Sequence, residues 1–220
     1  MGTIIIRLLK DRRISIIVYS VAGILLLWMY IAMFPGIRDS AEQFNEVLQN
    51  YPKEFFKVFN IEELNFTQIE NFLAVEHFSI VWPLLVIFLS ISFATLSIAT
   101  GIERGTIELA LAQPISRLRL FAGRYVAGLI ALVIFTVCSI FAIVPLAELH
   151  SVSYQLENFF NVALLSFLFG WAIYSVAFLF SSLFSERSKS FMGTGILLIL
   201  MYVLNIIANL KDNLNDLKYG

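Results

Sequence analysis

The chain of 220 residues has little charge, one cysteine and two histidines. Charged residues make up 14% of it, against roughly 25% in an ordinary soluble protein. The single cysteine, Cys138, excludes a disulfide scaffold, and we expect it to pack as a small apolar residue. A net charge of −1 gives no indication of nucleic-acid binding. The composition therefore excludes a disordered chain and an ordinary soluble domain.

Apolar residues are correspondingly abundant. Hydrophobic residues make up 59% of the chain, and aromatic residues make up 15%. They gather in five charge-free runs, each long enough for the roughly 20 residues that a membrane-spanning helix needs. Lipid cannot pair with peptide groups, so each run must satisfy its own backbone as a helix. We predict an all-α, polytopic helical membrane protein, a single transmembrane domain over residues 1–220. Its predicted spans are residues 14–34, 78–100, 125–147, 160–184 and 191–210.

Proline and glycine mark several predicted helix limits. Pro35-Gly36 is a stop signal after the first span, Pro83 suits the first turn of the second, and Pro145 interrupts the third. A cleavable signal peptide is the alternative for the first run. That run is too long for such a peptide, and no small-x-small cleavage site follows Phe34.

Lysine and arginine divide unequally between the two sides of the predicted bundle. Ten lie in the amino-terminal flank and in the loops 101–124 and 185–190, and five lie on the other side. Because basic residues collect on the cytoplasmic side, we expect a cytoplasmic amino terminus in the cell membrane. Five spans then leave the carboxyl terminus outside, and this odd count suggests a sixth span beyond it.

The predicted external segment, residues 36–77, is longer than a hairpin connection requires. Asp39-Ser40 can cap an amphipathic helix, and Pro52 suits the start of a second one. Such helices would lie on the outer leaflet or over the spans. The acidic surplus of the segment has two interpretations that stay open: exclusion of Lys and Arg from translocated loops, or an external binding site.

The predicted cytoplasmic loop 101–124 is too polar to span and too apolar to be a free linker. Thr106 can cap a short helix that Pro114 ends, and Ser116 can cap the next helix. Such a short helix, held between two spans, can pass force from a cytoplasmic partner to the membrane domain. It can equally be a surface helix that anchors to anionic headgroups.

The same loop carries a family resemblance. Glu103-x-Gly105-Thr106-x-Glu108-Leu109, followed by Gln113-Pro114-Ile115-Ser116-Arg117, resembles the signature of ABC-2 type permeases, in particular the bacterial and archaeal branch with a single permease domain. The family pattern is E-x-G-T-x-E-L-L-L, then P-hydrophobic-S-R. Ala110 stands where leucine is usual. Such permeases have six spans, in agreement with the odd count.

The resemblance implies the membrane half of an ATP-driven exporter. Its partners would be a cytoplasmic ABC ATP-binding subunit, a second permease copy and the lipid bilayer. The segment 103–113 would be a coupling helix that fits a groove of the ATP-binding subunit, with residues 2–13 as an interfacial helix beside it and residues 185–190 as a lesser contact. The implied coupling residues are Glu103, Gly105, Thr106, Glu108, Leu109, Gln113, Pro114, Ser116 and Arg117.

Other function classes find little support in the sequence. No G-x-x-x-x-G-K-[ST] run is present, so we expect no ATPase activity in this chain and no cofactor. We expect no metal site, because His77 and His150 stand apart at the outer ends of predicted spans. A secondary carrier is disfavoured because no predicted span core holds a charge. A non-transporting membrane scaffold or assembly factor with the same fold remains the alternative.

Overall fold

The computed structural model describes residues 1–40, 67–112 and 115–216, apart from the side chains of residues 109–111 and 209–216. Within these ranges every regular element is a helix, and no strand occurs. The elements are α1 (Gly2–Asp11), α2 (Arg13–Asp39), α5 (Ile69–Leu73), the π-helical η1 (Ala74–Val81), α6 (Trp82–Ser97), α7 (Ala99–Glu103), α8 (Thr106–Leu111), α9 (Arg117–Phe141), α10 (Ile143–Leu149), α11 (Leu156–Leu183) and α12 (Arg187–Asp216).

Five helical stretches of the described chain are long and apolar enough to cross a membrane. They are Arg13–Asp39, Ile69–Glu103, Arg117–Leu149, Leu156–Leu183 and Arg187–Ala208. The all-α, polytopic fold class predicted from the sequence is therefore confirmed. Each stretch contains most of one predicted span.

The predicted stop of the first helix at Pro35-Gly36 is wrong. The helix α2 continues through Pro35 to Asp39, with Ser40 as its C-cap residue. Asp39-Ser40 thus ends the first span. Phe34 is buried and Ile37 packs on the same core cluster, so packing holds the last turn although proline removes one backbone bond.

The second span also begins earlier than predicted. Its helical stretch starts at Ile69, so residues 69–77, which were predicted as the end of the external segment, are part of the span helix. Pro83 lies in the first turn of α6, directly after the π-helical η1. Because a proline ring clashes with the carbonyl four residues earlier, the wider turn of η1 lets the chain continue past it. Both predicted external helices fall on residues 41–66, outside the described ranges.

The third span is interrupted as predicted, but at Ala142, between α9 and α10. Pro145 occupies the first turn of α10, where its missing N–H has no intrahelical acceptor to lose. Cys138 is exposed on α9, so the expectation that it is packed inside is wrong.

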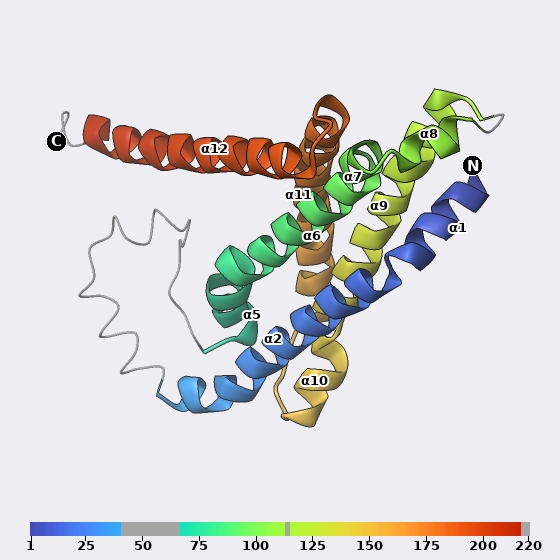
Figure 1. Cartoon of the computed structure of the whole chain (residues 1–220). Coiled ribbons are helices and arrows are strands. Elements are labelled where there is room, and N and C mark those ends of the chain that lie inside the picture. The colour runs from blue at the N-terminus through green and yellow to red at the C-terminus, as the bar shows by residue number, and fades with distance from the viewer. Residues whose placement is uncertain (41–66, 113–114, 217–220) are drawn as a thin grey trace.

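The helices pack around α6, which contacts α2, α9, α11 and α12 (Figure 1). The amino terminus, α8 and the turn from α11 to α12 lie at one end of the bundle, and α10 and α5 lie at the other (Figure 1). We call the first the basic end, because it carries the flanks and loops that hold ten of the lysines and arginines. The helix α12 starts there and leaves the bundle (Figure 1).

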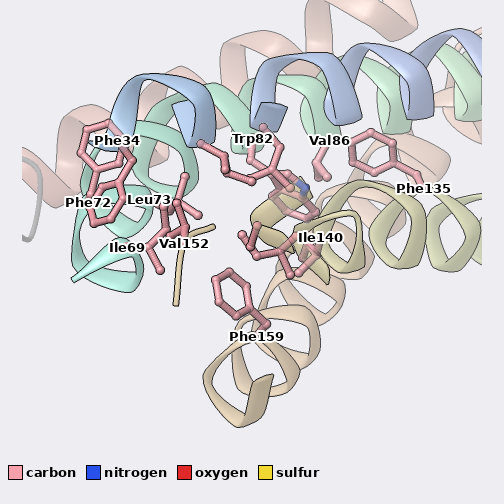
Figure 2. Close-up of a cluster of buried hydrophobic side chains, with 14 of the residues drawn as sticks. Phe34, Ile69, Phe72, Leu73, Trp82, Val86, Phe135, Ile140, Val152 and Phe159 are labelled. Atoms are coloured by element: carbon pink, nitrogen blue, oxygen red, sulfur yellow. The ribbon is translucent and has the colours of Figure 1, made fainter. Parts of the chain in front are cut away.

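Two apolar clusters fill the bundle. Figure 2 shows the one toward α5 and α10, in which aromatic and branched side chains of α2, α5, α6, α9 and α11 converge. Within it the Trp82 indole N–H donates to Ser139 Oγ at 3.0 Å. This bond replaces the hydrogen bond to water that the buried N–H loses. The second cluster, toward the basic end, joins Phe93, Ala127, Tyr174 and Phe178.

Glycines allow close approach between α9 and α11. A Cβ built on Gly128 would lie 2.1 Å from the Tyr174 side chain, whose hydroxyl donates to the Arg124 carbonyl at 3.3 Å. Tyr174 is buried, so its ring has little room to shift. The position therefore requires glycine for packing.

We predict that Gly128→Ala lowers the free energy of unfolding by about 1–3 kcal/mol, because the added methyl group overpacks against Tyr174. Gly195→Ala is the matched control, since a Cβ added at Gly195 would meet no heavy atom of the described neighbours within 4 Å. The measurement is the thermal midpoint of each variant in lipid nanodiscs. Equal midpoints for the two variants would contradict the packing argument.

Candidate functional site

The loop singled out by the sequence forms a compact unit at the basic end, made of α7, α8 and the start of α9 (Figure 1). We call residues 99–112 the coupling segment, after the role that the family resemblance implies for residues 103–113. Gly105 separates α7 from α8 and has φ +67°, in the left-handed region that glycine adopts without strain. This one residue folds α8 back against α7.

Thr106 is not the helix cap that the sequence predicted. Gly105 is the N-cap residue of α8, and Thr106 is its first helical residue. The Thr106 hydroxyl instead donates to the Gly101 carbonyl at 3.3 Å, which ties α8 to α7. Glycine takes the cap position because the reversal of the chain needs positive φ.

Ile107 anchors α8 to the bundle. It is partly buried and packs on the cluster toward the basic end. A Cβ on Gly101 would lie 3.7 Å from Ile107 and 3.6 Å from the Arg124 guanidinium, so the three residues are close neighbours. The prediction that this loop is too apolar to be a free linker is consistent with this contact.

Ser116 caps α9, as predicted: its hydroxyl oxygen accepts from the Arg119 amide at 3.3 Å. Arg117 is the first residue of α9, and its side chain is exposed. Gln113 and Pro114 lie outside the described residues, and Leu109 is described by its backbone only.

Glu103 has a partner within the chain. Its Oε2 accepts from the Arg187 amide at 3.0 Å, at the first residue of α12. A carboxylate at a helix amino terminus satisfies an amide that has no partner in the helix and favours the helix dipole. Glu108, in contrast, is exposed in the first turn of α8, and its carboxylate accepts no hydrogen bond within the described part of the chain. The two carboxylates that sequence reasoning treated alike therefore occupy different environments.

The amino-terminal helix borders the coupling segment. Ile5, Leu8 and Leu9 of α1 pack on the same cluster as Ile107, and a Cβ on Gly123 of α9 would lie 3.1 Å from Ile4. The sequence predicted a helix here.

Arginine side chains concentrate behind the coupling segment. Burial lowers the pKa of the Arg12 guanidinium, the neighbouring Asp11 opposes this, and Arg104 and Arg187 lower the pKa further. Sequence reasoning gave Arg12 no role. A basic residue just before a span indicates only the topology of that span.

The two histidines lie elsewhere. His77 is 0% exposed and contacts the rings of Tyr30 and Phe78 at centroid distances of 5.5 and 4.9 Å, so it is a core residue. His150 accepts from the Trp28 indole at 3.0 Å, near the end of α10.

The fold and the site define a multi-pass helical membrane protein with an ordered polar unit between its second and third spans. A family model described as ABC-2 family transporter protein matches residues 4–219. The chain therefore belongs to the ABC-2 family of transporter proteins, in which it is a permease domain. No curated protein and no solved structure matches it.

Membership has consequences for the site. An ABC-2 permease is a membrane transport component and is not itself the ATPase, and the family implies association with an ABC ATP-binding subunit. The exposed face of the coupling segment at the basic end is available for such a contact.

We predict that Glu103→Gln speeds amide exchange at residues 187–190 by roughly tenfold, since the neutral amide is a weaker acceptor for the start of α12. Glu108→Gln is the control and should leave that peptide unchanged. Hydrogen–deuterium exchange followed by mass spectrometry on the chain in nanodiscs measures both. Unchanged exchange in Glu103→Gln would contradict the contact.

Proposed function

We propose that this chain is the permease subunit of an ATP-driven exporter, in which a separate ATP-binding subunit drives substrate export by pushing on the coupling segment. The observation that carries the proposal is the ordered fold of that segment at the basic end. Gly105 sets its reversal, Ile107 fixes it to the spans, and Glu108 remains exposed. A unit held in this way can transmit force, whereas a flexible loop would absorb it.

The proposed contact surface consists of exposed polar residues next to α1. Glu108 and Arg117 would contact the ATP-binding subunit directly, while Glu103 and Ser116 would order the segment from within. Leu109, Gln113 and Pro114 would belong to the same contact by the family pattern. In this proposal the protein lies in the cell membrane, and the coupling segment and the amino terminus face the cytoplasm.

A second copy of the chain would complete the transporter. The sequence resemblance implies a pair of permease domains, and α12 has open surface for one. Only 6% of its most apolar window is buried within the described chain. Side chains such as Ile199 and Leu204 are exposed along it, and in a membrane they meet lipid or another helix.

The coupling role predicts that Glu108→Lys weakens capture of the ATP-binding subunit at least about tenfold, because a contact that attracts a carboxylate repels an ammonium group. Glu157→Lys is the matched control, since Glu157 is equally exposed but lies in the first turn of α11 at the other end of the bundle. The measurement is co-purification of the two subunits together with the ATPase rate of the complex.

Full capture and a normal ATPase rate in Glu108→Lys would contradict the assigned contact. A chain that spans the membrane, binds no ATP-binding subunit in any variant and still supports assembly of another complex would favour the scaffold alternative.

The proposed orientation predicts which side chains an impermeant reagent reaches. In a Cys138→Ser background, Leu149→Cys should react with an impermeant maleimide in intact cells, because Leu149 is 69% exposed at the end of α10. Ala112→Cys, exposed at the end of α8, should react only after the membrane is opened. Labelling of Ala112→Cys in intact cells would contradict the proposed orientation and would place the coupling segment outside the cell.

A further inference from the structure

The second span is broken close to the coupling segment. The helix α6 ends at Ser97 and α7 begins at Ala99, with Ile98 between them at φ −123° and ψ −63°. A break leaves carbonyls at the end of one helix and amides at the start of the next without their intrahelical partners. Inside a membrane domain such groups must find other partners, because lipid offers none.

Side chains supply these partners at the last four carbonyls of α6, residues 94–97. The Ala94 oxygen accepts from Ser181 Oγ at 2.8 Å, Thr95 from Thr100 Oγ1 at 3.3 Å, Leu96 from Arg12 Nη2 at 3.4 Å, and Ser97 from Arg124 Nη1. We call this set the joint.

Ser181 of α11 holds both sides of the break. Its hydroxyl donates to the Ala94 carbonyl of α6 and accepts from the Ala99 amide of α7 at 3.1 Å. A hydroxyl has one hydrogen and two lone pairs, so it can make both bonds at once. Ser181 is 0% exposed, so water does not compete for these bonds.

The other donors come from different parts of the chain. Arg12 lies between α1 and α2, Arg124 belongs to α9, and Thr100 belongs to α7 itself. In addition, Glu103 of α7 accepts a hydrogen bond from the Arg187 amide at the start of α12. The joint thus connects the base of the coupling segment to α9, to α11 and, through Arg12, to the start of α2.

We propose that the joint passes movement of the coupling segment into the other spans, and that Ser181 is its positioning residue. The proposal rests on the proposed function. In an unbroken helix, a push on α7 would travel along the second span only, because all bonds lie within that helix. At the joint the same push acts on α11 through Ser181 and on α9 through Arg124.

The first test needs no partner subunit. In Ser181→Ala the Ala99 amide and the Ala94 carbonyl lose a shared partner, so exchange in a peptide covering residues 94–103 should speed up at least about fivefold. Ser182→Ala is the matched control, because the Ser182 hydroxyl donates only to the Phe178 carbonyl of its own helix, at 2.8 Å. The measurement is hydrogen–deuterium exchange of the full chain in nanodiscs.

The second test uses the complex with the ATP-binding subunit. Spin labels at Arg38→Cys and Glu157→Cys, in a Cys138→Ser background, report the distance between the ends of α2 and α11 that lie farthest from the basic end. Binding of a non-hydrolysable ATP analogue should change this distance in the parent protein and in Ser182→Ala. In Ser181→Ala the change should fall by half or more, with capture of the subunit unaltered.

The outcomes separate the joint from the proposed function. Unchanged exchange in Ser181→Ala, or a full nucleotide-dependent distance change with the subunit bound, would overturn the role of Ser181. Failure of every variant, the parent included, to bind the subunit would contradict the proposed function, while the exchange comparison would still decide on the bonds of the joint.

Discussion

Pairing of backbone groups in a medium without water constrains this molecule more than any other factor. A helix meets the requirement by itself, which is why every regular element of the described chain is a helix. At Ile98 the helix is broken, so the backbone groups around it must pair with side chains of other helices. Ser181 and Arg124 meet this requirement with bonds from α11 and α9. The position of these two spans relative to α6 is therefore set by hydrogen bonds as well as by apolar packing.

The coupling segment follows from the same arrangement. Gly105 reverses the chain after α7, and Ile107 returns α8 to the cluster that also receives α1. Glu103 caps α12 from the same segment. A short polar unit is thus fixed to the spans at several points while Glu108 stays exposed. This combination of rigid attachment and free surface is what a contact for an energy-supplying subunit requires.

Hydropathy predicted the spans well, because charge-free runs of this length have few alternatives. The limits of the helices were predicted less well. Pro35 does not stop α2, and the π-helical η1 carries the second span past Pro83. At Pro35 packing of the neighbouring side chains Phe34 and Ile37 overrides the local preference of proline, whereas at Pro83 the wider turn of η1 accommodates the ring.

The sequence singled out the segment 103–113 but did not predict its internal bonds. The Ser116 cap involves residues three apart, so local pattern was enough to predict it. The bonds of Ser181 and Arg12 join residues more than 80 positions apart, and a single serine or arginine in a sequence carries no sign of its partner. Thr106 was wrongly predicted as the cap because the need for positive φ at Gly105 depends on how α8 folds back.

The central claim is that an ATP-hydrolysing subunit touches the coupling segment. Site-specific photocrosslinking in cells tests it most directly, with the photoreactive residue placed at Glu108 and, for comparison, at Leu149. The account predicts a crosslink to an ATP-binding subunit from position 108 and none from position 149. A crosslink to the ATP-binding subunit from position 149 and none from position 108, or only lipid adducts at position 108, would contradict it.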